Sequence, residues 1–267
     1  QEGFDKLLMI DRPSLWLPEN ERAQVLMRKT AKIIHIDPNG PNGLQEWEQM
    51  DYKNLVSGTP VQRGHLYHEI QEQGYMVGVW DCTAFTDQMM PYSVDEYMLL
   101  LAGDVAMVMP DGTEVKINAG DAFVIPKGLK CQWKQNSFVH KIFMILDSPI
   151  GDAQNASLNR ISVPDFDLGK SGTTLVKTRT EFLNAAGTMQ VDVQLFAAMR
   201  QPRMKCRANL LISVLEGTLT LNDGVNEYRF SKGQTAYVQQ GGSMGWSTSD
   251  GTKLISASFL NNPLNQL

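Results

Sequence analysis

Cysteine is scarce in this sequence, and long hydrophobic runs are absent. The three cysteines, Cys82, Cys131 and Cys206, lie far apart in no paired spacing, which argues against a disulfide framework and favours a reducing compartment. No apolar run approaches the roughly 20 residues that a membrane-spanning helix needs. We therefore expect a cytoplasmic protein. Because the sequence begins at Gln1 rather than at methionine, a secreted or periplasmic protein with a removed signal peptide is the alternative.

An excess of positive charge is also absent. The formal net charge is −5, which gives no electrostatic reason for binding nucleic acid or an anionic membrane, so neither partner is expected. The length of 267 residues fits one large domain or two of ordinary size. The composition, with 42% hydrophobic and 20% charged residues, is that of a globular protein with an apolar core.

Two segments, 78–146 and 191–259, repeat the same order of glycines and tryptophans. In the first, Gly103 is followed by the string GDAFVIPKG and then by a tryptophan. In the second, Gly217 is followed by the string GQTAYVQQG and then by a tryptophan. The tryptophan stands equally far from the start of its string in both copies, and the spacing between turn glycine and string is nearly equal. The shared order and spacing indicate a structural duplication.

Each copy consists of short β-rich runs separated by turn sequences such as MPDGTE and LNDGVN. This pattern predicts an antiparallel sandwich or barrel rather than strands that alternate with helices. Short helices are expected at residues 19–28 and at a turn near Glu181. We expect four segments. Residues 1–61 form an arm that packs on the first barrel, and residues 62–150 form the first barrel. Residues 151–175 are a connector, and residues 176–267 form the second barrel.

The string GDAFVIPKG, the glycine turn before it and the duplicated plan resemble the cupin superfamily, in particular the two-barrel cupins. WDCTAF, DEYMLLLAGDVAM and PKGLKCQW are most similar to the branch that includes ureidoglycine aminohydrolase-like and ethanolamine-utilisation-like proteins. The resemblance covers roughly residues 62–260 and concerns fold more than activity, because one fold hosts many chemistries. It implies an all-β protein of two tandem RmlC-like jelly-roll barrels, with a few short helices and a cavity at the barrel mouth.

The resemblance also implies where a metal would be held. Metal-binding cupins use two histidines and a glutamate from a first motif and one histidine from a second. The corresponding positions are Met90, Tyr92, Glu96 and Cys131 in the first copy and Met204, Cys206, Leu210 and Met244 in the second. None of the four histidines, His35, His65, His68 and His140, falls on a ligand position. Thiolate and carboxylate suit zinc, but methionine is a soft ligand and tyrosine must lose a proton with a pKa of about 10. We expect no tightly held metal and no other cofactor.

Glu96 is the central functional candidate. Alternate residues of a strand face the same side, so Glu96 shares a face with Met98 and Leu100. If that face points inward, as the resemblance implies, a buried carboxyl group without a partner could act as a general acid or base near neutral pH. Tyr92 and Cys131 would be its nearest polar neighbours, and these three are the predicted catalytic residues. The alternative is a structural ion pair between Glu96 and an arginine or lysine.

Two functions remain open. The first is a metal-independent acid–base enzyme acting on a small polar metabolite, of aminohydrolase, isomerase or lyase type. The second is a non-catalytic protein that binds or senses a small molecule in an adaptable methionine-rich cavity, with a structural second barrel. We expect the cavities to be lined by Met90, Met98, Trp133, Met204, Cys206, Met244 and Trp246. The strand that carries Glu96 is apolar on both faces, so it needs cover on both sides. The N-terminal arm, the other barrel or a second subunit could supply this cover. We expect a homodimer, with internal pairing of the two barrels as the alternative.

Overall fold

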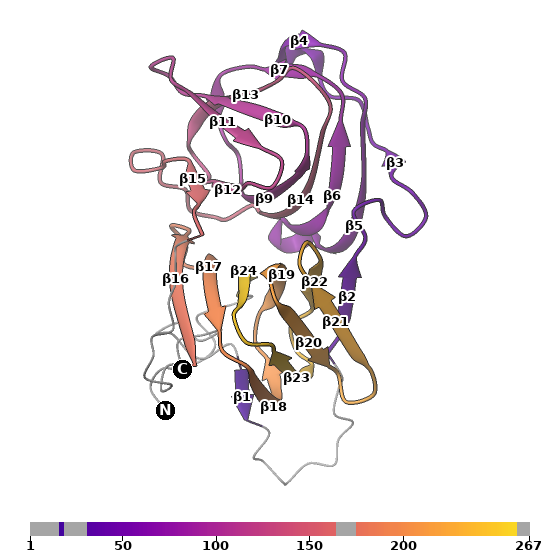
Figure 1. Ribbon diagram of the computed structural model, residues 1–267. Coiled ribbons are helices and arrows are strands. Elements are labelled where there is room, and N and C mark those ends of the chain that lie inside the picture. The colour runs from indigo at the N-terminus through magenta and orange to yellow at the C-terminus, as the bar shows by residue number, and fades with distance from the viewer. Residues whose placement is uncertain (1–15, 19–30, 164–174, 261–267) are drawn as a thin grey trace. The chain divides into compact units, whose positions relative to one another are not determined.

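The computed structural model describes residues 16–18, 31–163 and 175–260 (Figure 1). Within these ranges the chain consists of β-strands and two short 3₁₀ helices, and it contains no helix long and apolar enough to cross a membrane. The expected all-β class is confirmed. The chain separates into two compact units. We call residues 37–162 with 184–187 the first barrel, and the described parts of 1–36, 163–183 and 188–267 the second barrel.

The first barrel contains β3 (Gln45–Glu46), η1 (Tyr52–Asn54), β4 (Leu55–Gly58), β5 (Gln62–Ile70), η2 (Gln71–Gln73), β6 (Tyr75–Cys82), β7 (Phe85–Asp87), β8 (Met90–Pro91), β9 (Asp95–Ala102), β10 (Asp104–Val108), β11 (Glu114–Asn118), β12 (Ala122–Ile125), β13 (Lys130–Gln135), β14 (Val139–Leu146) and β15 (Asn159–Ile161). One sheet has the order β11-β10-β13-β7-β4, with β8 also paired to β13. The other has the order β15-β12-β9-β14-β6-β5-β3. In Figure 1 these strands curl around a common interior.

The second barrel contains β1 (Trp16–Pro18), β2 (Ile33–Ile36), β16 (Val176–Leu183), β17 (Met189–Phe196), β18 (Met199–Cys206), β19 (Asn209–Glu216), β20 (Thr218–Asn222), β21 (Glu227–Ser231), β22 (Thr235–Val238), β23 (Ser243–Thr248) and β24 (Thr252–Phe259). Its two sheets have the orders β1-β18-β23-β20-β21 and β16-β17-β24-β19-β22-β2. The order and pairing of β17 to β24 repeat those of β6 to β14. This correspondence matches the duplication read from the glycine spacing.

The segments outside the repeat supply edge strands. From the expected N-terminal arm, β1 and β2 pair with β18 and β22 of the second barrel. From the same arm, β3 and β4 pair with β5 and β7 of the first barrel. The expected connector contributes β15, which pairs with β12. The arm therefore adds strands to both units.

One expected helical turn is wrong, and another lies outside the described residues. Glu181 lies within β16, which pairs with β17 along its length. The register shifts between Thr180 and Phe182, so Glu181 itself has no partner in the ladder. Such a bulge interrupts the alternation of a strand and can be mistaken for a turn in the sequence. The expected helix at residues 19–28 is not among the described residues.

The repeated turn glycines have a steric cause. Gly103 and Gly217 follow β9 and β19 with φ of 78° and 75°, a region that residues with a Cβ rarely adopt. A Cβ on Gly103 would lie 2.0 Å from the carbonyl oxygen of Phe138. Backbone atoms at the start of β14, or just before it, and at the start of β24 therefore leave room only for glycine, and the same turn geometry recurs in both barrels.

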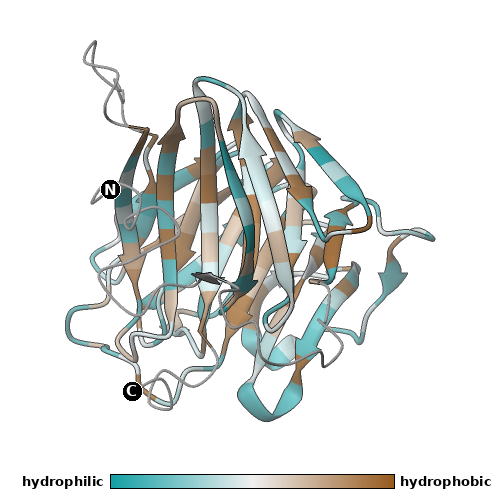
Figure 2. Cartoon of the chain, turned by 90° about the horizontal axis from the view of Figure 1, so that it is seen from below, coloured by the Kyte–Doolittle hydropathy of each residue, from teal (hydrophilic) through white to brown (hydrophobic). Residues whose placement is uncertain are grey.

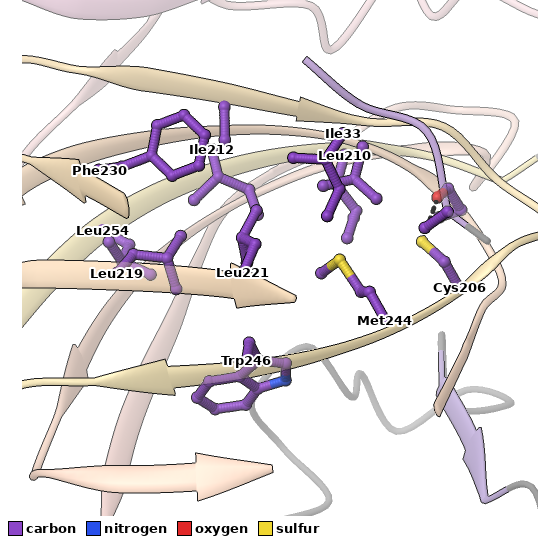
Figure 3. Packing of buried hydrophobic residues seen from close by; sticks show 14 of the residues in the cluster. Ile33, Cys206, Leu210, Ile212, Leu219, Leu221, Phe230, Met244, Trp246 and Leu254 are labelled. Carbon is purple, nitrogen blue, oxygen red and sulfur yellow. Dashed lines mark hydrogen bonds between the residues drawn. The ribbon is translucent and has the colours of Figure 1, made fainter. Parts of the chain in front are cut away.

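Each barrel buries an apolar interior, and Figure 2 shows hydrophobic and hydrophilic residues alternating along several of the strands. In β10 and β20, buried positions alternate with partly exposed ones, as expected for strands with one face toward a core. In the second barrel, buried hydrophobic side chains pack into one continuous cluster, part of which Figure 3 shows. The hydrophobic cluster of the first barrel lies next to buried charged groups.

Candidate active site

A cavity of about 430 Å³ lies in the first barrel, within the size range of small-molecule sites. Its aromatic lining is Trp47, Trp80, Phe85, Trp133 and Phe143, and its methionines are Met50, Met76 and Met90. The polar side chains on its wall are Asp51, Asn54, Gln62, Asp87, Tyr92, Glu96 and Lys141. The lining comes from strands on both sheets of the barrel and from the segment that precedes β5.

Glu96 is buried inside the barrel, with 3% of its surface exposed. Its Oε1 accepts a hydrogen bond from Nζ of Lys141 at 2.7 Å, and its Oε2 accepts one from the hydroxyl of Tyr92. Both carboxylate oxygens are therefore engaged. The expectation of an unpartnered carboxyl group is wrong, and the alternative of an ion pair is correct, with Lys141 as the partner. Because Glu96 still lies on the cavity wall, the ion pair does not remove it from contact with a ligand.

Lys141 is the residue that the sequence analysis missed. It lies on β14, and its side chain is 9% exposed. Its ammonium contacts Sδ of Met98 at 3.2 Å and lies 4.7 and 5.0 Å from the ring centroids of Trp80 and Trp133. Aromatic ring faces attract cations, so this ammonium is held by a carboxylate on one side and by indoles on the others. A lysine within the mostly apolar string SFVHKIFMIL was the available signal.

Tyr92 completes a chain of three polar groups, Tyr92, Glu96 and Lys141. Burial raises the pKa of the Tyr92 phenol well above its usual value, and the nearby charge of Glu96 raises it further. The phenol is therefore neutral in the physiological range and serves as a hydrogen-bond donor to Glu96. Tyr92 and Glu96, which were predicted together, are in contact.

Asp87 is a second acidic group on the cavity wall, at the end of β7. Its Oδ1 accepts a hydrogen bond from the backbone N–H of Trp133 at 2.6 Å. Burial raises the pKa of Asp87 to about 6, an effect that this backbone hydrogen bond only partly offsets. Nothing in the sequence around Asp87 distinguishes it from an exposed acidic residue, because its burial depends on strands that pair with it from elsewhere in the chain.

Cys131, the third predicted catalytic residue, is buried in β13 opposite Met90. Burial raises the pKa of its thiol to about 12, and the charge of Asp87 contributes in the same direction. It packs within the core of the first barrel and is not on the cavity wall. A thiol in such a state is a poor nucleophile, because the thiolate is the reactive form.

We expect Cys131 to resist alkylation in the native protein. Iodoacetamide at pH 8, followed by mass spectrometry, should modify all three cysteines rapidly in urea and only very slowly in buffer, because burial raises the thiol pKa of Cys82, Cys131 and Cys206 to about 12. Native labelling of Cys131 at the rate of the unfolded chain would contradict this placement.

The other predicted lining residues divide between the two barrels. Met90 and Trp133 line the cavity, whereas Met98 is fully buried beside Lys141. In the second barrel, Met204, Cys206, Met244 and Trp246 are buried in the hydrophobic core shown in Figure 3. The sulfhydryl of Cys206 donates to the carbonyl oxygen of Ala208 at 2.9 Å.

The second barrel replaces the charged pair by leucines. In the first barrel, β9 pairs with β14 so that Glu96 lies opposite Ile145 and Leu100 opposite Lys141. The same register in the second barrel places Leu210 opposite Ser258 and Val214 opposite Leu254. Leu210 and Leu254 are therefore the counterparts of Glu96 and Lys141, and both lie in the apolar core (Figure 3).

The donors at the implied ligand positions of the first barrel do not suit a metal ion. The phenol of Tyr92 stays protonated and donates a hydrogen bond to Glu96, and the thiol of Cys131 is also protonated near neutral pH. Glu96 already binds the ammonium of Lys141. Across residues 31–163 and 175–260, no group of three or more histidine, cysteine, aspartate or glutamate side chains could hold a metal. The ammonium of Lys141 thus provides the positive charge next to this carboxylate.

Comparison with known proteins supports the fold. Residues 71–143 match the model of the EutQ-like cupin domain, and no curated protein matches the sequence. A solved protein of unknown function in the DUF861 family, from Pseudomonas syringae pv. tomato, is similar with a TM-score of 0.64 and 17% identity, over 85% of this chain and 99% of that one.

Two further solved structures share the architecture. A cupin 2 conserved barrel domain protein from Leptotrichia buccalis is similar with a TM-score of 0.55 and 13% identity, over 89% of this chain and 100% of that one. A putative dioxygenase from Nostoc punctiforme is similar with a TM-score of 0.55 and 15% identity, over 92% of this chain and 87% of that one. At these identities the likeness concerns the fold alone. The chain is thus a cupin-fold protein of two jelly-roll barrels, and residues 71–143 of its first barrel match the EutQ-like cupin domain.

Proposed function

We propose that the first barrel is a metal-independent acid–base enzyme that transfers protons to and from a small metabolite. The observation that carries this proposal is the chain of Tyr92, Glu96 and Lys141 on the wall of an aromatic cavity. A buried carboxylate with a phenol donor on one oxygen and an ammonium on the other is a polar assembly in a site of low dielectric constant. Such groups can exchange protons with a bound ligand.

Each member of the chain has a distinct role in this proposal. Glu96 accepts a proton from the ligand or returns one to it. Tyr92 donates a hydrogen bond and so fixes the orientation of the carboxylate, while Lys141 supplies a fixed positive charge that balances it. Isomerase, lyase and aminohydrolase reactions all require such proton transfers, and the resemblance to ureidoglycine aminohydrolase-like proteins supports the last of these. Hydrolysis by a metal-bound water is not favoured by the donors present.

We expect the native protein to exchange protons of its ligand with solvent. Small polar metabolites that have an acidic C–H next to a carbonyl group can be incubated with the protein in D₂O and followed by proton NMR, while ammonia release is assayed in parallel. Loss of a C–H signal, or release of ammonia, at a rate proportional to protein concentration would support the proposal. Metabolites that bind saturably without either reaction would contradict it.

The alternative proposal is a binding or sensing protein without catalysis. The observation that favours it is that both oxygens of Glu96 are already engaged inside the protein. The methionine and aromatic side chains on the cavity wall would adapt to an apolar ligand. In either case we propose a structural role for the second barrel, because Leu210 and Leu254 occupy the positions that Glu96 and Lys141 have in the first barrel.

A further inference from the structure

The charges on the cavity wall are unbalanced. Glu96 and Lys141 form an ion pair at 2.7 Å and cancel one another. The remaining charged side chains of the lining are Asp51 and Asp87, and the lining contains no further lysine, arginine or histidine. Among the ion pairs of residues 31–163 and 175–260, none involves Asp87. The cavity therefore presents net negative charge to a ligand.

Asp87 is the stronger of the two as a binding group. Asp51 is exposed and caps η1 by accepting a hydrogen bond from the backbone N–H of Lys53. Asp87 is partly buried, and its side chain accepts a hydrogen bond from the backbone of Trp133. A carboxylate withdrawn from water gains more from a cationic partner than one that stays hydrated.

The groups that face Asp87 do not neutralise it. Tyr92 and Cys131 both respond to its charge, and both remain protonated near neutral pH, because burial raises the pKa of each. Lys134, on the strand that pairs with β7, is bound to Glu114 at 2.8 Å. Within residues 31–163 and 175–260 no cationic side chain pairs with Asp87, so its carboxylate is available to a cationic ligand.

The aromatic lining favours the same kind of ligand. The ammonium of Lys141 already lies over the rings of Trp80 and Trp133, which shows that these walls accommodate a cation. The cavity of about 430 Å³ is large enough for a small organic molecule and too small for a folded partner. A ligand with an ammonium group and an apolar body would satisfy both the acidic and the aromatic parts of the wall.

We propose that the cavity binds a small organic amine in its protonated form, with the ammonium on Asp87 and the apolar body against the tryptophans. This proposal names the ligand class for the proposed proton-transfer site and rests on it for any chemistry, although binding alone does not require catalysis. Charge-assisted hydrogen bonds are stronger than neutral ones, so the amine should be preferred over a neutral molecule of the same shape.

The test compares three probes of similar size, 2-phenylethylamine, 2-phenylethanol and phenylacetate, by quenching of tryptophan fluorescence and by calorimetry. At pH 7.5 we expect the amine to bind about ten- to a hundredfold more tightly than the alcohol, and phenylacetate to bind most weakly. Because burial raises the pKa of Asp87 to about 6, the carboxylate is present above that pH and is lost below it. The preference should therefore fall about tenfold at pH 5, where the amine is still protonated.

Asp87→Asn separates this site from general electrostatic attraction. Asparagine keeps the acceptor for the Trp133 N–H, and thermal unfolding would confirm that the variant is folded. We expect Asp87→Asn to lose the preference for the amine and Asp51→Asn to keep it. Tighter binding of phenylacetate, no saturable binding of the amine, or an unchanged preference in Asp87→Asn would overturn the proposal. If the amine binds as expected and the carbonyl metabolites bind without exchanging protons or releasing ammonia, this proposal stands and only the catalytic proposal is refuted.

Discussion

We expect the Glu96→Gln protein to retain its ligand but to transfer protons about 10²–10⁴-fold more slowly than the native protein, the usual contribution of a positioned acid–base group. Glutamine keeps the size of the side chain and can still accept the hydrogen bond from Tyr92. It cannot take up a proton at the reacting position. Initial rates of deuterium incorporation, with ligand binding measured separately by fluorescence, would check both parts of this expectation.

The control for this experiment removes the charge that Glu96→Gln leaves behind. In the single variant, the buried ammonium of Lys141 has lost its counterion, which alone could disturb the site. The double variant Glu96→Gln, Lys141→Met contains no unpaired charge from this pair, so its fold should be less perturbed. It should be as slow as Glu96→Gln if the carboxylate handles the proton. Recovery of the native rate in the double variant would show that Glu96 only balances Lys141.

The second large effect is on stability. We expect Lys141→Met to lower the free energy of unfolding by about 3–5 kcal/mol, because it leaves the carboxylate of Glu96 buried without its cation. Methionine is one atom shorter than lysine but keeps an unbranched apolar side chain, so most of the packing is retained. Urea unfolding followed by tryptophan fluorescence would measure the change, since Trp80 and Trp133 lie beside the ammonium.

The second barrel supplies the matched control. The triple variant Tyr92→Phe, Glu96→Leu, Lys141→Leu replaces all three polar residues. It removes both charges and also the Tyr92 hydroxyl, which would otherwise lose its acceptor. Leu210 and Leu254 occupy the equivalent positions in the second barrel and are fully packed there. We expect this triple variant to be about as stable as the native protein or more stable by about 1–4 kcal/mol. A loss as large as that of Lys141→Met would mean that the polar chain itself stabilises the barrel.

If both outcomes hold, the polar chain is retained for function rather than for stability. The two barrels share strand order, register and turn glycines, and yet only the first keeps charged groups at these interior positions. Leu210 and Leu254 occupy these positions in the second barrel, so the fold does not require charges there. On the expected outcomes, the ion pair in the first barrel has a cost in folding free energy that an apolar pair avoids.

Much of the fold could be predicted because its signals are local. The turn glycines, the alternation of apolar residues and the repeated spacing are properties of short windows, and each is set by steric limits or by the period of a strand. The local pattern wrongly predicted a helical turn near Glu181, where a β-bulge shifts the register of the strand pair. This pattern also gave no indication that β1 and β2 pair with strands of the second barrel.

The sequence by itself determined the all-β class and the duplication, and the resemblance to cupins implied that the face carrying Glu96 points inward. Only the tertiary structure decided the partners of that residue, because the lysine that pairs with it is 45 positions away and reaches it from the neighbouring strand. It also decided that Asp87 is partly buried and that Cys131 packs away from the cavity. Burial and charge pairing depend on which strands meet in space, and a strand's own residues do not specify this.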